Sequence, residues 1–293
     1  MFQEEIENRY LVNIKGTSDG AQLKFFKDGF WYKQDYFCGE GKAETLTTIL
    51  LDCSSLDKEE YVSYEYGFIN GKEGCRSRNF LKSGEELISL YRFYEVMTGK
   101  KLNQDISFLE TPEERADFVV SFFKKEAGLD LTDYFAKIFQ LDSIIVNEDR
   151  HFNNLAIIRT ADGTYKPAPI FDNGKSLLVG NYSAREHLSA AENRKRTMAQ
   201  PFSGSFTTNR KLFGDGFYMD FDRCFKMLKD FPDCQEKEVL LAGLIEEKII
   251  QEEKIKTETF EEKLDRADKM VSIEVKNNPS SGTGHKKERI LER

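Results

Sequence analysis

Three oxygen-bearing side chains in the middle of the chain have the types and spacing needed to hold a metal ion. Asp149 is followed five residues later by Asn154, and Asp172 opens an Asp-Asn-Gly turn further along. Carboxylate and amide oxygens are the ligands that Mg²⁺ prefers, and a carboxylate can also accept a proton. The three residues are therefore candidates for a metal-dependent reaction.

The separation of these residues fits phosphoryl transfer. The segment DRHFNN, residues 149–154, spaces its Asp and Asn as a kinase catalytic loop does, where the Asp takes the substrate proton and the Asn binds Mg²⁺. Asp172 would hold the metal against the phosphates. His151 either contacts the transferring phosphate or is a buried loop histidine that hydrogen-bonds to backbone. The alternative, Asx turns at the ends of a hairpin, requires three spacings to agree by coincidence.

A kinase also needs a lysine on the phosphates, paired with a glutamate from a nearby helix. Lys33 lies on a predicted strand and Glu44 near the start of the first predicted helix, so these two are the candidates for the ion pair. Lys27 and Glu40 are the competing assignment.

A small, flexible loop follows the first predicted strand and would cover the phosphates with its backbone N–H groups, although it lacks the G-x-G-x-x-G form. The residues assigned to nucleotide binding there are Lys15, Gly16, Thr17 and Ser18. Turn chemistry alone also explains Thr17 and Ser18, and autophosphorylation of one of them is a further alternative.

The first part of the chain predicts a mainly antiparallel sheet that carries one helix. Aromatic and alternating segments predict the strands, and the Asp28-Gly29 dipeptide predicts a hairpin. The predicted strands are residues 10–15, 22–26, 30–35, 61–69 and 75–81, and the predicted helix is 41–51. A boundary follows at Lys82-Ser83-Gly84.

The rest of the chain is predicted to be helical, apart from one hairpin around Asp162-Gly163 that should bring the two acidic turns together. The helices are predicted at 85–98, 112–127 and 131–146 and within 221–267, and the hairpin at 155–159 and 165–171. The domains are therefore a sheet lobe (1–82), a helical lobe (83–267) and a disordered tail (268–293).

The segment 175–216 is long, weakly periodic and rich in basic residues. These residues form either a solvated loop or an electropositive shelf for an acidic substrate or phosphate. They are Arg185, Arg194, Lys195, Arg196, Arg210 and Lys211.

Composition narrows the class of protein. The chain has 293 residues, a net charge of −8 and no apolar run of the roughly 20 residues that cross a bilayer. Five widely spaced cysteines favour reduced thiols over a disulfide framework. We expect a cytoplasmic monomer without membrane or direct nucleic-acid binding, although export as an effector stays open.

The D-R-H-x-x-N and D-x-G pattern resembles the catalytic signature of phosphatidylinositol-kinase-like enzymes and of HipA-like bacterial serine/threonine kinases, whereas ordinary protein kinases read H-R-D. With Lys15-Gly16-Thr17-Ser18, Tyr32-Lys33 and Ala43-Glu44, the chain is most similar to the compact HipA-related kinases of the CtkA type. The resemblance covers roughly residues 10 to 180.

This resemblance implies a two-lobed α+β kinase fold that uses ATP and Mg²⁺. In the family, the residue matching Asp149 is the catalytic base and those matching Asn154 and Asp172 bind the metal. Family members phosphorylate Ser or Thr of proteins, often including themselves, so the implied partner is a protein substrate of unknown identity. The alternatives are a lipid or small-molecule kinase of the same fold and a nucleotide-binding pseudokinase module.

Overall fold

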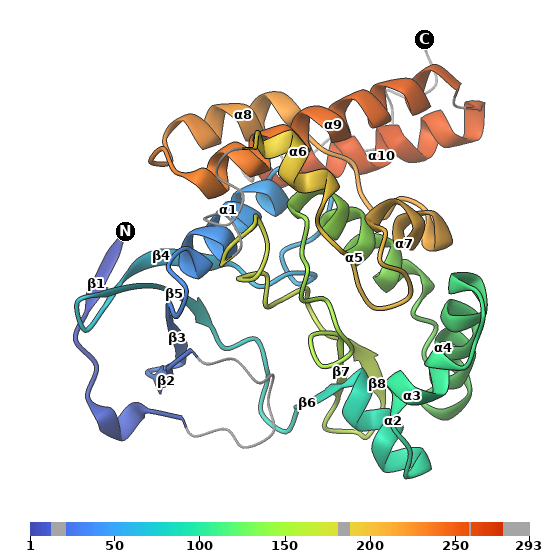
Figure 1. Cartoon of the computed structure of the whole chain (residues 1–293), viewed down its shortest axis with the longest axis horizontal. Helices are drawn as coiled ribbons and strands as arrows, with labels where there is room; N and C mark the ends of the chain where they lie inside the picture. The colour runs from blue at the N-terminus through green and yellow to red at the C-terminus, as the bar shows by residue number, and fades with distance from the viewer. Residues whose placement is uncertain (13–21, 181–187, 258, 278–293) are drawn as a thin grey trace.

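A five-stranded sheet forms the N-terminal lobe (Figure 1). The computed structural model describes residues 1–12, 22–180, 188–257 and 259–277. The strand order is β1-β4-β5-β3-β2, and only the β1–β4 pair is parallel. The strands are β1 (Phe2–Glu4), β2 (Lys24–Lys27), β3 (Phe30–Gln34), β4 (Tyr64–Ile69) and β5 (Lys72–Arg78). The mainly antiparallel sheet is as predicted.

Two tight turns set the register of this sheet. Asp28 and Gly29 join β2 to β3 with φ of 51° and 79°, and Asn70 and Gly71 join β4 to β5 with φ of 50° and 74°. Both dipeptides readily adopt positive φ, which two-residue hairpins require. The predicted strand 10–15 differs: its first residue ends a short 3-10 helix, η1 (Asn8–Tyr10), and residues 13–15 lie outside the described part of the chain.

Helix α1 (Glu40–Asp52) crosses the sheet and carries Glu44. The Asp35 carboxylate fixes its start by accepting hydrogen bonds from the backbone N–H groups of Gly39 and Gly41, both at 2.8 Å. Gly41 is required there, because a Cβ would lie 2.5 Å from the carbonyl of Gly74 on β5. The helix therefore packs directly on the strand that neighbours β3.

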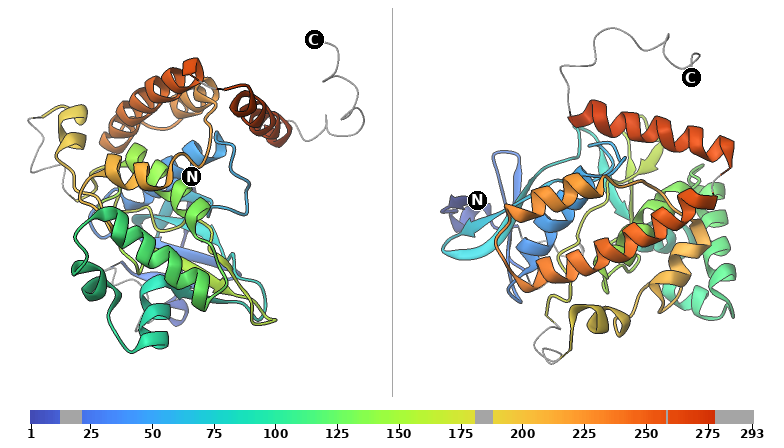
Figure 2. Two further views of the ribbon diagram at one scale, coloured as in Figure 1. Left: turned by 90° about the vertical axis from the view of Figure 1, so that its right-hand side faces the viewer. Right: turned by 90° about the horizontal axis from the view of Figure 1, so that it is seen from above.

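The far end of α1 is fixed to the C-terminal part of the chain. The Ser55 N–H donates to the Tyr218 carbonyl at 2.9 Å, and the Asp220 N–H donates to the Cys53 carbonyl at 2.8 Å. Helices α8 (Phe221–Lys229) and α9 (Gln235–Thr257) lie over α1, as Figure 2 shows from above. The apolar side chains of α1 thus join the core of the helical lobe.

The predicted helix 85–98 is wrong in its first part. Residues Glu86–Ser89 form strand β6, and helix α2 (Leu90–Thr98) begins only after Ser89, whose hydroxyl accepts a hydrogen bond from the Arg92 N–H. Apolar spacing fits both structures here, and pairing with β7 selects the strand. The helices that follow are α3 (Leu102–Ser107), α4 (Pro112–Glu126) and α5 (Thr132–Ile145).

The predicted hairpin is present as β7 (Ala156–Arg159) and β8 (Tyr165–Pro167), and β6 completes a three-stranded sheet. The segment 149–154, which contains Asp149 and Asn154, precedes β7, and Asp172 follows β8. Because β7 and β8 are antiparallel, both segments lie at the same end of the hairpin, close to the end of α5.

The segment 175–216 contains two helices that the sequence did not predict, α6 (Ala190–Lys195) and α7 (Phe206–Phe213), each capped by a serine hydroxyl. Helix α10 (Phe260–Asn277) extends into the predicted tail 268–293, because Ile273 is buried against the body of the protein. Residues 278–293 lie outside the described residues. No helix in the described ranges has the length and apolar character to cross a membrane.

Candidate active site

Lys33 connects the sheet lobe to the segment that follows β8. Its Nζ lies 2.9 Å from Oε1 of Glu44 on α1 and 2.9 Å from Oδ1 of Asp172 after β8. The Lys33 ammonium also lies over the Tyr64 ring, 5.0 Å from its centre. The lysine and glutamate that the sequence paired are therefore in contact, and Asp172 is added to them.

Burial and charge oppose each other in this cluster. Burial alone would raise the pKa of Asp172, but the Lys33 ammonium and the nearby Lys24 hold it well below its ordinary value. Burial would lower the pKa of Lys33, whereas Asp172 and Glu44 raise it well above its ordinary value. For Glu44, burial dominates and raises the pKa despite Lys33. Asp172 and Lys33 therefore carry opposite charges at neutral pH.

The turn that carries Asp172 is held in an uncommon conformation. Asp172 has a φ of 59°, in the left-handed region that Asp tolerates better than most residues. The second oxygen of Glu44 accepts a hydrogen bond from the Asn173 N–H at 3.0 Å, and a Cβ at Gly174 would lie 3.2 Å from Cβ of Glu40. The helix of the sheet lobe therefore fixes this turn.

Asn154 and Asp149 lie together in the loop between α5 and β7. The Asn154 amide nitrogen donates to the Asp149 carbonyl at 2.8 Å, and the Asp149 N–H donates to Oδ1 of Asn147 at 3.0 Å. Oδ1 of Asn154 is buried and has no hydrogen-bond partner among the described residues. The Asp149 side chain is 42% exposed. The loop thus presents one accessible carboxylate and one unpaired amide oxygen.

His151 lies beside the proposed base. Its Nε2 is 3.6 Å from Oδ1 of Asp149, and its buried Nδ1 has no hydrogen-bond partner in the described part of the chain. One of the two expected roles of this histidine, a hydrogen bond from the ring to backbone, is not present among the described residues. The geometry leaves the imidazole able to contact a group that approaches Asp149.

Arg150 connects the loop that carries Asp149 to the turn that carries Asp172. Its guanidinium is fully buried and forms a two-pronged ion pair with Asp142 on α5, at 3.0 to 3.2 Å. It also donates to the Phe171 carbonyl at 2.9 Å and to Oδ1 of Asn173 at 2.6 Å. The loop with Asp149 and the turn with Asp172 are therefore held by one side chain.

The donor set fits Mg²⁺. Among the described residues, no group of three or more His, Cys, Asp or Glu side chains is placed to share a metal. The candidate ligands are instead the unpaired Oδ1 of Asn154 and the charged carboxylate of Asp172. Hard oxygen ligands of this kind suit Mg²⁺ rather than zinc.

The remaining sequence-based assignments have different outcomes. The competing pair does not form, because Lys27 lies 3.8 Å from Glu4 and Glu40 accepts hydrogen bonds from the Tyr36 and Phe37 N–H groups. The loop residues Lys15, Gly16, Thr17 and Ser18 lie outside the described residues. Arg185 of the basic segment lies outside them as well.

The sequence analysis missed Asp142 and Arg150. The sequence contains a signal for this pair, since Asp142 interrupts an apolar stretch, between Leu141 and Ile144, in a helix that is largely buried. A carboxylate in such a place needs a cation or several donors. The nearest arginine in the sequence is Arg150, which the structure places against it.

Comparison with known proteins supports the class of fold. No model of a known protein family matches the chain, and a search of curated proteins finds no significant match. Among solved structures, the chain is similar to the proinflammatory kinase CtkA of Helicobacter pylori, with 16% identity and a TM-score of 0.53 over 80% of this chain and 90% of that one. The protein therefore has a two-lobed, CtkA-like kinase fold.

Proposed function

We propose that this protein is a kinase that transfers the γ-phosphate of ATP to a Ser or Thr hydroxyl of a protein. The observation that carries the proposal is that Glu44 and Asp172 both contact Lys33, although the three residues come from separate parts of the sequence. This is the arrangement that phosphoryl transfer requires, with one cation for phosphate charge and one carboxylate for a metal.

In this mechanism Asp149 orients the acceptor hydroxyl and takes its proton. The hydroxyl oxygen forms a bond to the γ-phosphorus while the bond from that phosphorus to the β-γ bridging oxygen breaks, and ADP leaves. Lys33 neutralises phosphate charge, and Glu44 holds Lys33 in place. His151 lies close enough to Asp149 to contact the transferring group.

Asn154 and Asp172 would hold Mg²⁺, which supplies charge neutralisation for the phosphates. Asp172 is suited to this role because its pKa lies well below the ordinary value, so the carboxylate is ionised across the physiological range. Asn154 is suited because its oxygen has no other partner among the described residues. Arg150 keeps the two segments in fixed relation.

The test is incubation with labelled ATP, Mg²⁺ and a bacterial lysate, with the Asp172→Asn variant as the comparison. We expect label on Ser or Thr of a protein with the wild type and none with the variant. Label on a lipid or small molecule instead would identify a different acceptor. A Mg²⁺-dependent thermal stabilisation by ATP without any label would contradict the proposal and indicate a nucleotide-binding module.

A further inference from the structure

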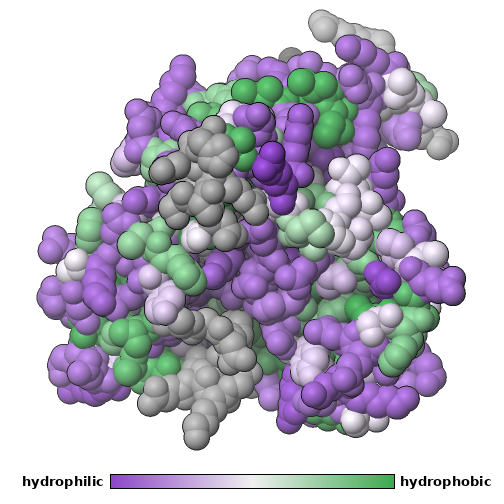
Figure 3. All heavy atoms as spheres, viewed as in Figure 1, coloured by the Kyte–Doolittle hydropathy of each residue, from purple (hydrophilic) through white to green (hydrophobic). Residues whose placement is uncertain are grey.

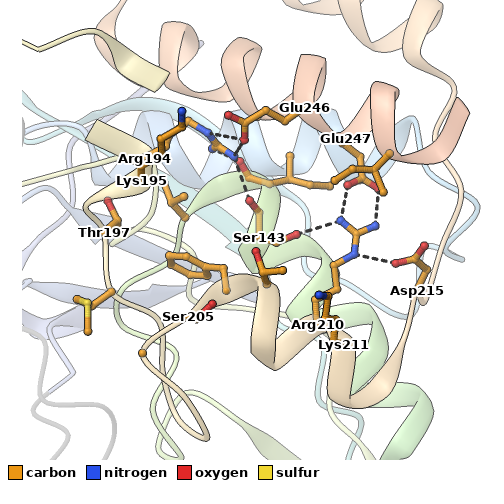
Figure 4. Close-up of a pocket in the computed structure, with 18 of the residues that line it drawn as sticks. Ser143, Arg194, Lys195, Thr197, Ser205, Arg210, Lys211, Asp215, Glu246 and Glu247 are labelled. Carbon is orange, nitrogen blue, oxygen red and sulfur yellow. Dashed lines mark hydrogen bonds and ion pairs between the residues drawn. The ribbon is translucent and has the colours of Figure 1, made fainter. Parts of the chain in front are cut away.

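A cavity lies in the helical lobe, and neither Lys33 nor Asp172 lines it. It is open to one side, has a volume of about 640 Å³ and is lined by the end of α5, by α6 and α7, and by one face of α9 (Figure 4). Gly243 on α9 allows this arrangement, since a Cβ there would lie 2.2 Å from the Ile144 carbonyl. The nucleotide and metal sites described above do not use this cavity.

Two buried arginines build the cavity wall. Arg194 donates to the carbonyls of Ser143 and Ile144 at the end of α5 and pairs with Glu246 at 2.9 Å. Arg210 pairs with Glu247 at 2.5 Å, and Figure 4 shows both guanidinium groups directed at α9. Because their charges are matched by carboxylates, these arginines stabilise the wall and are not available to a ligand.

The lysines of the cavity differ from the arginines. Lys195 and Lys211 are exposed and make no hydrogen bond or ion pair with another described residue. Five basic and three acidic side chains line the cavity, although the whole chain has a net charge of −8. A positive cavity on an acidic protein attracts acidic groups and leaves the rest of the surface repulsive to them.

The same cavity has an apolar part. Met198, which is 64% exposed, and Ile250, which is 38% exposed, line it together with Phe206. Figure 3 shows that hydrophilic residues predominate on the face of the molecule seen in Figure 1, with hydrophobic residues near its top, at its lower left and at its right. A ligand that combines acidic and apolar side chains matches this lining better than a small anion does.

The cavity adjoins the proposed catalytic loop. Val146 lines it and directly precedes Asn147, and the Gln200 side chain donates to the Glu148 carbonyl at 2.9 Å. The segment between α6 and α7 therefore contacts both the cavity and the loop that carries Asp149. A ligand in the cavity would therefore contact the segment that is hydrogen-bonded to the loop with Asp149.

We propose that this cavity docks an acidic segment of the protein substrate, with Asp or Glu side chains on Lys195 and Lys211 and an apolar side chain against Met198 and Ile250. The inference rests on the proposed kinase function, which it deepens by naming the chemistry of the substrate. Within the basic segment, Lys195 and Lys211 would thus form the shelf for an acidic substrate, whereas Arg194 and Arg210 stabilise the wall behind it.

The test is a binding measurement on the full chain with the Asp172→Asn substitution, so that no transfer is needed. The probes are a fluorescent peptide with Asp and Glu around Leu and Ser, and the same peptide with Asn and Gln instead. We expect the acidic peptide to bind at least about tenfold more tightly, with an affinity that falls as salt is raised. Equal binding of both peptides, or no binding of the acidic one, would overturn the docking site.

The charge-reversed variant Lys195→Glu/Lys211→Glu locates the effect. Neither lysine side chain makes a hydrogen bond or ion pair in the described part of the chain, so the variant should keep the wild-type circular dichroism spectrum and thermal midpoint. We expect at least about tenfold weaker binding of the acidic peptide. The matched control is Lys226→Glu on α8, which is exposed and outside the cavity and should bind as before. Equal losses in variant and control would place the attraction elsewhere.

Transfer to the same acidic peptide separates the two proposals. In the chain without the Asp172→Asn substitution, the double charge reversal should raise KM at least about tenfold and leave kcat unchanged, because the lysines bind substrate without touching the reacting atoms. An unchanged KM would overturn the docking site while the kinase function stands. Lysine-dependent binding with no transfer by the wild type would support the site and contradict the kinase function.

Discussion

The ammonium nitrogen of Lys33 lies 2.9 Å from Oδ1 of Asp172, and this contact links the sheet lobe to the turn proposed to bind metal. The same carboxylate would have to reach a metal during catalysis. Binding of Mg²⁺ and ATP should therefore move the Lys33 ammonium from Asp172 toward phosphate while Glu44 keeps its hold on it.

Replacing Lys33 tests this cluster energetically. Lys33→Met leaves Glu44, which is 1% exposed, without its cation, so we expect a loss of about 3 kcal/mol in the free energy of unfolding. Adding Glu44→Gln should cost less than the sum of the two single variants, because the buried carboxylate is no longer unpaired. Urea denaturation of the wild type, the two single variants and the double variant measures the coupling free energy between Lys33 and Glu44. If the losses of the two single variants simply add in the double variant, the ion pair is contradicted. Lys100→Met, at an exposed lysine, is the control.

Asp149→Asn separates catalysis from stability. The side chain is 42% exposed and its main local contacts are made by backbone atoms, so the variant should unfold within about 0.5 kcal/mol of the wild type. The rate of transfer should fall at least about a hundredfold, because the amide cannot accept the hydroxyl proton. Single-turnover kinetics with labelled ATP measure this step. Near wild-type turnover would remove Asp149 as the base, and Asp222→Asn on α8 should change neither quantity.

Arg150→Lys tests the link between loop and turn. Lysine keeps the charge but cannot bind Asp142 in two-pronged fashion while also reaching the Phe171 carbonyl and Asn173. We expect a loss of about 2 to 4 kcal/mol in the free energy of unfolding and a lower kcat under conditions where the variant is still folded. Denaturant unfolding and steady-state kinetics measure the two effects. Arg159→Lys, at an exposed position on β7, should be neutral.

Asp35 gives the fold a pH dependence. Burial raises the pKa of Asp35 to about 6, despite hydrogen bonds from the Gly39 and Gly41 N–H groups, and Glu40 and Glu73 raise it further. The folded protein therefore holds a proton that the unfolded chain releases above about pH 4, so this contribution to stability is present at low pH and lost as pH rises to about 6.

The expected effect appears as a difference between two proteins. From about pH 4 to about pH 7, the stability of Asp35→Asn relative to wild type should rise by about 2 kcal/mol, since the amide does not titrate. Denaturation at several pH values measures this difference. A difference that stays constant across the range would show that Asp35 has an ordinary pKa and would contradict the prediction.

Local chemistry predicted part of this fold well. The Asp28-Gly29 dipeptide predicts the β2–β3 hairpin, and Thr111-Pro112 predicts the start of α4, where a capping box with Glu114 is present. Strand β5 begins at Lys72, three residues before the predicted strand 75–81. The reason is that Asn70-Gly71 forms the turn between β4 and β5.

Other features depend on contacts that no local pattern contains. Strand β6 is stabilised by pairing with β7, in which Ile88 lies opposite Ile157. Helices α6 and α7 are held by ion pairs of Arg194 and Arg210 with glutamates of α9. Within the site, residue types and order pointed to Lys33, Glu44 and Asp172. Their convergence required the packing of segments 139 residues apart, as the Lys33–Asp172 contact shows.

Because α1 is fixed to the segment around Tyr218, the two partners of the Lys33–Glu44 ion pair belong to parts of the protein that can unfold separately. The buried apolar residues of α1 belong to one cluster with the helical lobe, whereas Phe2, Phe25, Tyr32 and Ile69 form a separate cluster within the sheet. Cooperative units of local unfolding tend to follow such clusters. In hydrogen exchange, the backbone amide of Glu44 should then be protected as long as those of the helical lobe, and the amide of Lys33 should exchange earlier, with those of the sheet. A transient opening would therefore break the ion pair by moving Lys33 while Glu44 stays in place.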